Sequence, residues 1–459
     1  MSQAAETGVP FFRTGSYAPV TDELTAFDLP VAGTIPPALN GWYLRNGPNP
    51  RQATAHWFTG DGMIHGVRLE NGRAAWYRNR WVRTESFDHP APLYNPDGSR
   101  NLHRGAANTH VIRHAGRTLA LVESSLPYEI TNELETLGVY DFDGKLVDSM
   151  TAHPKICPTT GELHFFGYGS LTSPHMTYYR ADASGELTIS RGVDVPALTM
   201  MHDMALTAKH VIFMDLPIVF NLDVAIKGKG DMPYRWDDNY GARLGVLRRD
   251  DPFGEIRWFD IDPCYVFHVA NAYDAKGADG SSIVLEAVRY PEMWRDNPQW
   301  HTNNGFGAAD GVMWRWTIDL ERGTVDEQQI DDRGVEFPRI DDRRTGLPAR
   351  YVVTVGSQDG VAPVPRSSNL IRYDRDRGTV EQHRFENDRT AAPGEAVFVP
   401  ADPGADEAAG WYLTYAYDPA RDGSDLVIVD ASDFQGEPVA RVRLPQRVPH
   451  GFHGNWVAA

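Results

Sequence analysis

A recurring β-hairpin is the feature that most constrains how this chain can fold. Apolar or aromatic runs end in an acidic turn that contains glycine, and a second strand leaves each turn. Examples are GVRLENGRAAWY, WTIDLERGTVDEQ and IRYDRDRGTVEQHRF. Asp and Asn side chains close such turns, and Gly supplies the left-handed backbone that a tight hairpin needs. Several loosely similar hairpins in one chain predict a radial repeat rather than separate domains.

The length of 459 residues is too great for a plain β-sandwich but suits a β-propeller of four-stranded blades. Seven blades would use about 65 residues each, which leaves room for inserted loops. We expect a single all-β propeller domain over 1–459, with an N-terminal extension at 1–29. Insertions at 218–241 and 285–312 are expected to cap the propeller axis, the alternative being ordinary solvated loops.

Composition excludes several classes of protein. Asp and Glu number 62 against 44 Lys and Arg, a net charge of −18, which argues against nucleic-acid binding. The same charge means that any membrane contact would be hydrophobic rather than ionic. Two cysteines, Cys157 and Cys264, indicate buried thiols in a reducing compartment. The N-terminus lacks a secretory signal and no apolar run is long enough to span a bilayer, so we expect a cytoplasmic protein.

Four of the 16 histidines stand in short contexts of similar character. They are His153 in TAHPKI, His202 in MMHDMAL, His268 in CYVFHVANAY and His453 in GFHGNW. None pairs at helical spacing, so an HExxH site is absent. Such distant residues meet only if the fold brings strand ends together, as the innermost strands of a propeller do. Taken singly, each is compatible with an ordinary histidine, and His450 is a rival ligand from spacing alone.

Three glutamates occupy contexts where a carboxylate is unexpected: Glu123 in LALVESS, Glu336 in GVEFPRI and Glu395 in PGEAVFVP. Buried carboxylates need partners. A metal-bound imidazole donates its free N–H to a carboxylate, which fixes its tautomer. Three glutamates would therefore suit three of the four histidines, although exposed positions at strand ends remain the alternative.

Motifs in order along the chain resemble those of the carotenoid cleavage oxygenases, which include carotenoid, apocarotenoid and stilbene dioxygenases. They include NGWYLRNGPNP (40–50), AHPKICPTTGELHFFGY (152–168), MMHDMALTAKHVIFMDLP (200–217) and VPHGFHGNW (448–456). The resemblance runs from about residue 30 to the C-terminus and implies a seven-bladed propeller with a loop or helix cap over an axial metal site. It also implies one Fe(II) per chain, with the ligands His153, His202, His268 and His453.

The resemblance assigns further residues to the site. Glu123, Glu336 and Glu395 match the family's outer carboxylates, which orient three of the imidazoles. Thr109, in the ANTHV motif, matches a small side chain that sits beside the iron and obstructs one coordination position. The implied reaction is cleavage of a C=C bond by O₂ to give two carbonyl products, without a reducing cosubstrate.

An apolar conjugated substrate requires an apolar tunnel lined by aromatic side chains. Phe58, Phe267 and Phe337 adjoin the motifs and are our candidates for that lining, with ordinary core positions as the alternative. Stilbene-cleaving relatives carry Lys directly before the first outer Glu, where this chain has Val122. We therefore expect an apocarotenoid or carotenoid substrate, with a stilbene or phenylpropenoid as the alternative.

Two alternatives from other classes remain open. A non-catalytic propeller scaffold would be expected to lack a ligand or an outer carboxylate, and all seven candidates are present. A propeller hydrolase with a carboxylate pair such as Asp61 and Glu123 would be active without iron or O₂.

Overall fold

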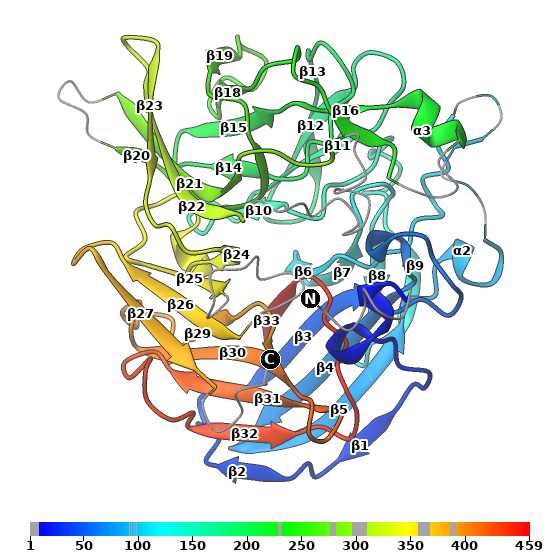
Figure 1. The fold of residues 1–459 in the computed structure, drawn as a ribbon, viewed down its shortest axis with the longest axis vertical. Coiled ribbons are helices and arrows are strands. Elements are labelled where there is room, and N and C mark those ends of the chain that lie inside the picture. Colours follow the sequence, from blue (N-terminus) through cyan, green and yellow to red (C-terminus); the bar gives the residue numbers. More distant parts are fainter. Residues whose placement is uncertain are drawn as a thin grey trace.

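The fold is a ring of seven β-sheets. The computed structural model describes residues 9–227, except 91, 93, 96 and 98, and residues 232–275, 281–295, 310–356, 368–385 and 392–459. In these residues, seven antiparallel sheets of four or more strands follow one another around a central axis in chain order (Figure 1). The expected all-β, seven-bladed propeller is confirmed.

Blade 1 closes the ring by joining strands from both ends of the chain. From the axis outward its strands are β33 (Gly454–Ala458), β3 (Gly41–Pro48), β4 (Gly62–Glu70), β5 (Arg73–Trp81) and β1 (Thr25–Phe27). The C-terminal strand is thus the innermost one and pairs antiparallel with β3. Blade 7 has its outermost strand from the N-terminal region, because β2 (Val31–Gly33) pairs with β32 (Ala440–Arg443). Both terminal blades are therefore tied to the opposite end of the chain.

The other blades run outward from the axis as simple meanders. Blades 2 and 3 consist of β6 (His110–His114), β7 (Arg117–Leu121), β8 (Tyr128–Ile130) and β9 (Thr136–Val139), then β10 (Lys155–Ile156), β11 (Leu163–Tyr168), β12 (Met176–Ala181) and β13 (Leu187–Val193). Blades 4 and 5 consist of β14 (Met204–Leu206), β15 (His210–Asp215), β18 (Arg243–Arg248) and β19 (Arg257–Asp260), then β20 (Tyr265–Ala275), β21 (Ser282–Tyr290), β22 (Val312–Asp319) and β23 (Thr324–Gln329). Blade 6 consists of β24 (Val335–Arg339), β25 (Tyr351–Gly356), β26 (Asn369–Asp374) and β27 (Thr379–Arg384), and the remaining strands of blade 7 are β28 (Ala392–Pro393), β29 (Val397–Pro400), β30 (Gly410–Asp418) and β31 (Gly423–Asp430).

Short elements outside the blades lie in the connections. A two-stranded sheet of β16 (Ile218–Phe220) and β17 (Tyr234–Trp236), with α3 (Leu222–Lys227) between them, is inserted between β15 and β18. The other helical turns are α2 (Glu85–Asp88), η1 (Phe11–Arg13), η2 (Gly15–Tyr17), η3 (Trp57–Thr59) and η4 (Asp342–Arg344). No helix among the described residues has the length and apolar character needed to cross a membrane.

Two expected boundaries differ from the structure. The expected extension at 1–29 includes β1, which hydrogen-bonds to β5 and so belongs to blade 1; residues 1–8 lie outside the described residues. The expected insertion at 285–312 begins inside β21, because the run LEAVRY continues a ladder with β20 and β22. Residues 296–309 of that insertion lie outside the described residues, as do 228–231 of the other.

The blades are held together by apolar side chains between their faces. Blades 6 and 7, for example, share a cluster that contains Val353, Leu370, Phe398, Val427 and Phe434. Burying each such side chain stabilises the fold by about 1.5–3 kcal/mol. Both cysteines are buried and neither is in a disulfide, as their number predicts. The packing between blades fixes the inner strands, and with them the residues that face the axis.

Candidate metal centre

The four candidate histidines lie on innermost strands or directly before them. His153 precedes β10, His202 precedes β14, His268 lies in β20, and His453 precedes β33. These segments belong to blades 3, 4, 5 and 1. Because every innermost strand borders the axis, residues far apart in the sequence converge there.

The four imidazole rings lie against one another. The Nε2 atoms of His153 and His202 are 2.9 Å apart. The ring centroid of His153 is 5.0 Å from that of His268 and 4.6 Å from that of His453. Ligand nitrogens of His153, His268 and His453 all lie within 4.8 Å of one another, and His202 contacts this group through His153. All four side chains are buried.

Each of the three candidate carboxylates lies beside one of these rings. His202 Nδ1 is 2.6 Å from Glu123, His268 Nδ1 is 2.5 Å from Glu336, and His453 Nδ1 is 2.9 Å from Glu395. The glutamates come from blades 2, 6 and 7, so every blade contributes one of the seven residues. With Nδ1–H donated to a carboxylate, the Nε2 lone pair of each ring is free for a metal ion.

Irregular backbone directs two of these side chains. The ladder between β24 and β25 shifts register after Glu336, and the next residue, Phe337, has a φ of 53°. The ladder between β20 and β21 shifts register between Val266 and Val269, which spans His268. Bulges of this kind redirect side chains beside functional sites, and a non-glycine residue with positive φ is strained. The backbone therefore departs from regular strand where His268 and Glu336 meet.

Burial keeps two of the histidines uncharged. Burial lowers the pKa of His153 and of His453 well below the ordinary value, and the neighbouring imidazoles lower both further. Burial also lowers the pKa of His268, but the charge and hydrogen bond of Glu336 outweigh it and raise this pKa overall. Only neutral imidazole can bind a metal, so burial of His153 and His453 favours the ligating form.

These residues fit a divalent transition metal. Two imidazole nitrogens 2.9 Å apart suit neighbouring ligands of one ion, because bonds of about 2.1 Å at right angles separate the nitrogens by about 3.0 Å. Imidazole binds iron, zinc and copper, and three outer carboxylates provide the hydrogen bonds that metal-bound histidines normally make. The donor set therefore supports a metal centre.

Thr109 lies at the edge of the histidine group, directly before β6. Its carbonyl accepts a hydrogen bond from the His453 backbone N–H at 3.1 Å, and its hydroxyl donates to Asn108 Oδ1 at 3.0 Å. The Asn108 amide in turn donates to the carbonyls of Phe58 and Gly60. These hydrogen bonds hold Thr109 beside His453.

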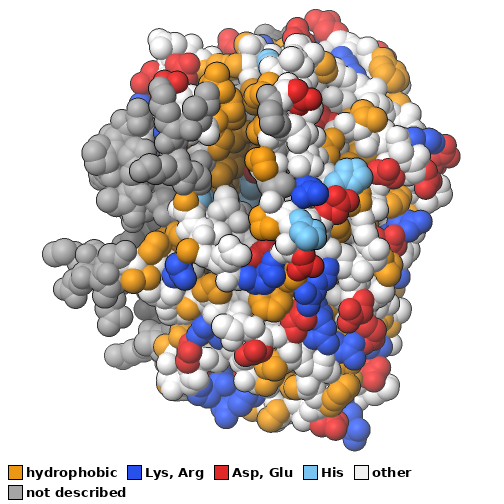
Figure 2. All heavy atoms as spheres, turned by 90° about the vertical axis from the view of Figure 1, so that its right-hand side faces the viewer, with side chains coloured by type: hydrophobic (Ala, Val, Ile, Leu, Met, Phe, Trp, Pro, Cys, Tyr) orange, Lys and Arg blue, Asp and Glu red, His pale blue; other side chains and the backbone are white. Residues whose placement is uncertain are grey.

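An apolar cavity reaches the histidines from one side, and Figure 2 shows a hollow lined by hydrophobic side chains on one face of the molecule. The three predicted phenylalanines, Phe58, Phe267 and Phe337, all line this cavity together with Thr109 and Val122. Further aromatic side chains that the sequence did not single out also line it: Trp57, Tyr94, Tyr168, Tyr234, Tyr290 and Phe452. Trp57 and Phe452 adjoin Phe58 and His453 in the chain, and that adjacency was a usable signal.

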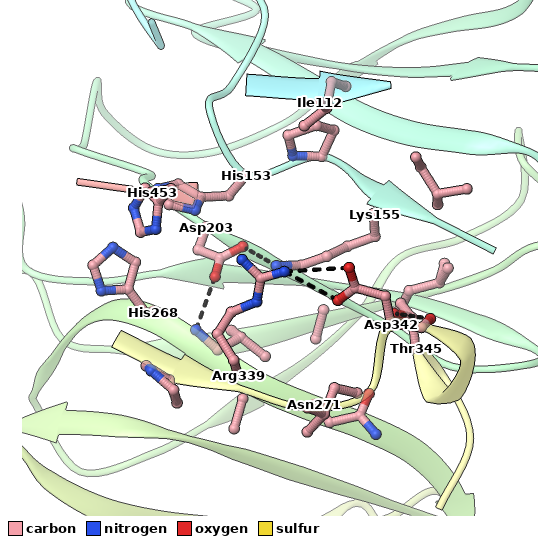
Figure 3. A pocket seen from close by; sticks show the side chains of 18 of the residues that line it. Ile112, His153, Lys155, Asp203, His268, Asn271, Arg339, Asp342, Thr345 and His453 are labelled. Carbon is pink, nitrogen blue, oxygen red and sulfur yellow. Dashed lines mark hydrogen bonds and ion pairs between the residues drawn. The ribbon is translucent and has the colours of Figure 1, made fainter. Parts of the chain in front are cut away.

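A polar cavity of about 470 Å³ reaches His153, His268 and His453 from another side (Figure 3). Its lining includes charged side chains that sequence reasoning did not select: Lys155, Asp203, Arg339, Asp342 and Arg343. Arg339 binds Glu395 at 3.1 Å and Asp342 at 3.2 Å. His450 lines neither cavity; its ring packs 5.0 Å from that of Tyr17, away from the four clustered histidines.

Comparison with known proteins identifies the family. The family profile described as retinal pigment epithelial membrane protein matches residues 17–458. A carotenoid cleavage oxygenase of Mycobacterium tuberculosis is 39% identical, over 99% of this chain and 99% of the relative. An isoeugenol monooxygenase of Pseudomonas nitroreducens is 32% identical, over 96% of this chain and 97% of the relative.

Two solved structures share the fold over nearly the whole chain. The cobalt-substituted apocarotenoid oxygenase of Synechocystis superposes with a TM-score of 0.84 and 26% identity, covering 98% of each chain. The lignostilbene dioxygenase of Pseudomonas brassicacearum gives a TM-score of 0.86 and 26% identity, covering 98% of this chain and 99% of the other. The chain therefore belongs to the carotenoid cleavage oxygenase family and is a dioxygenase that cleaves carbon–carbon double bonds.

Proposed function

We propose that the chain holds one Fe(II) ion between His153, His202, His268 and His453 and cleaves an apocarotenoid or carotenoid into two carbonyl products. The observation that carries this proposal is the convergence of four buried imidazoles, three of which line an apolar cavity. Four neutral ligands leave coordination positions open. A ferrous ion held there would supply the site at which O₂ is activated.

The outer carboxylates, Glu123, Glu336 and Glu395, orient three ligands and balance the charge of the ion. Two of them are themselves supported: Tyr290 donates to Glu336 at 3.0 Å, and Arg339 and the Gly454 N–H bind Glu395. Since the four ligands are neutral, these carboxylates would offset the +2 charge of the ion from outside its ligand sphere. A hydrolytic zinc site would instead pair its metal with a nearby general base.

Aromatic side chains position the substrate. Phe267 contacts His202 with ring centroids 5.3 Å apart, and Phe337 stacks on His268 at 5.2 Å. A conjugated chain in contact with these rings would lie directly beside the metal ligands, with little water around it. Thr109, fixed beside His453, would narrow the remaining approach and so direct O₂ to one position.

A stilbene or phenylpropenoid substrate is the second candidate, and two observations favour it. The described part of the apolar cavity has a volume of about 190 Å³, below the roughly 300–1,000 Å³ usual for ligand sites. In addition, one relative is named for isoeugenol and one structural neighbour for lignostilbene. Val122 weighs against this candidate, because it puts an apolar side chain on the cavity wall beside Glu123.

Metal analysis combined with oxygen uptake tests the proposal. We expect one iron per chain and O₂ consumption with an apocarotenal that exceeds the consumption with resveratrol. Product masses would identify the bond that is cut. Faster uptake with resveratrol would favour the second candidate, and absence of iron and of uptake with both would favour a scaffold.

The composition and charge of the chain also bear on its location in the cell and on its partners. We infer a cytoplasmic enzyme whose partners are O₂ and an apolar conjugated small molecule, with no nucleic acid. Any contact with a membrane would be peripheral and hydrophobic, because a net charge of −18 disfavours an anionic surface. Fractionation of cells, with and without a high-salt wash, checks both statements.

A further inference from the structure

His153 differs from the other three axial histidines in how it is held. His202, His268 and His453 each bind an outer carboxylate through Nδ1. Among the described residues, the His153 ring has no such carboxylate partner, and its Nε2 lies 2.9 Å from His202 Nε2. The glutamate of the adjacent blade 2, Glu123, is already bound to His202 of blade 4. Something other than a ring hydrogen bond must therefore position His153.

The residues two positions before and after His153 both bind the segment that carries His202. The Thr151 hydroxyl donates to the His202 carbonyl at 2.9 Å and accepts from the His153 N–H at 3.2 Å. The Lys155 ammonium lies 2.7 Å from Asp203. These contacts hold the backbone around His153 to blade 4 on both sides.

Asp203 extends this connection to a third blade. One of its oxygens faces Lys155 and accepts from the Met204 N–H, and the other accepts from the Val269 N–H at 2.8 Å. Val269 directly follows His268. Asp203 is 1% exposed, and Figure 3 shows it between Lys155 and the axial histidines. One carboxylate thus joins the segments that carry three candidate ligands.

We infer that Asp203 is a positioning residue for the metal centre, and that it acts with Lys155 and Thr151 in place of the carboxylate that His153 lacks. The inference rests on the proposed function, because it requires a metal ion between the histidines. Asp203 touches neither ion nor substrate; it sets the separation of His153, His202 and His268 through their backbones.

Charge and tethering predict opposite results for one variant, which makes the inference testable. Lys155→Met removes a positive charge from the neighbourhood of the ion, so electrostatics alone would hold a divalent cation more tightly. Loss of the Lys155–Asp203 tether would instead release the ion faster. Thr151→Val removes the other tether without changing any charge.

The experiment measures release of Co(II) from the reloaded full-length protein to an excess of chelator, together with the Co(II) absorption spectrum. We expect Lys155→Met to release the ion roughly 10-fold faster and to change the spectrum, as changes around metal ligands typically do. Thr151→Val should accelerate release by a smaller factor, and Lys155→Arg, which keeps the ion pair with Asp203, should restore slow release.

Asp215→Asn is the matched control. Asp215 is another fully buried aspartate of blade 4, bound to Arg243 at 2.9 Å and lining neither cavity. It should lower thermal stability without changing metal release. Unchanged or slower release from Lys155→Met and Thr151→Val would overturn the inference and leave the proposed function intact. A wild-type protein that takes up neither Fe(II) nor Co(II) would overturn the proposed function and this inference together.

Discussion

The two cavities that meet at the axial histidines differ in how many charged side chains line them. The apolar cavity is lined mainly by aromatic side chains, among them Phe58, Phe267 and Phe337. The polar cavity is lined by opposite charges in pairs, such as Lys155 with Asp203 and Arg339 with Asp342. His268 and His453 thus border both cavities, whereas His202 borders only the apolar cavity and His153 only the polar one.

This difference separates substrate binding from the positioning of the metal ligands, because the two functions need different surroundings. A conjugated hydrocarbon gains affinity from apolar walls, whereas four ligands held on four separate blades need directional bonds to fix their positions. Buried ion pairs stabilise a fold little, but breaking one leaves an uncompensated charge. We therefore expect changes on the apolar side to act on substrate and changes on the polar side to act on the metal.

Removal of an axial histidine should have the largest effect. His202→Ala is expected to abolish both metal retention and turnover, because three ligands would hold Fe(II) poorly and His202 borders the apolar cavity. Iron content per chain and O₂ consumption measure the two losses. Normal iron occupancy in this variant would remove His202 from the metal ligands.

Replacement of an outer carboxylate should have the next largest effect. Glu336→Gln is expected to keep the fold but to weaken metal affinity by about 10–100-fold. We expect Glu395→Gln to lie at the lower end of that range, because Glu395 borders the polar cavity, where Arg339 keeps its contact with Asp342. Competition with a chelator measures both affinities, and an unchanged affinity in either variant would count against the pairing of that carboxylate with its histidine.

Shortening one side chain in each cavity should distinguish an effect on substrate binding from an effect on the stability of the fold. Phe58→Ala removes part of the apolar wall and should lower kcat/KM for an apocarotenal by roughly 10-fold, equivalent to about 1.4 kcal/mol of lost contact. Ile112→Ala, in the polar cavity, should lower the free energy of unfolding by about 2–5 kcal/mol with kcat/KM unchanged. Equal kinetic losses in the two variants would mean that both cavities bind substrate.

Much of the fold and of the candidate site could be read from local sequence. Acidic glycine turns between apolar runs are local signals, and they indicated the repeated hairpins correctly. Histidines and glutamates in apolar contexts stand out because burying them has a cost. Asp203 carried the same signal, inside the apolar run MMHDMAL, but only the contact with Val269 of another blade reveals what it joins.

Other features depend on contacts that sequence does not encode locally. Tyr290 lies in an ordinary strand run, and its bond to Glu336 arises only because blades 5 and 6 are adjacent. The positive φ of Phe337 depends on a register shift in β24, and no residue of the run VEFPRI predicts that shift. The expected start of the insertion at 285 was wrong for the same reason, since the pairing of β21 with β22 decides where the strand ends.

Acidification should produce the smallest effect, which is a fall in the free energy of unfolding. Two buried histidines that are not among the four axial ones cause it. Burial lowers the pKa of His110, which lines the polar cavity, and of His450, which packs on Tyr17, to about 3 in each case. In the unfolded chain both protonate near the ordinary value of about 6.5. Above that pH neither histidine makes the free energy of unfolding depend on pH. Between about 6.5 and 3 the unfolded state binds more protons, so the free energy of unfolding falls as the pH falls.

Each histidine should contribute about one proton, or about 1.4 kcal/mol per pH unit, to this slope. Urea unfolding of the metal-free protein between pH 7.5 and 5 measures it, and His450→Gln should flatten it by that amount. If water enters the polar cavity, His110→Gln should flatten the slope less than His450→Gln does, since a hydrated imidazole protonates more readily in the folded state. Equal slopes for the two variants would show that the polar cavity, despite its charges, is as dry around His110 as the aromatic packing around His450.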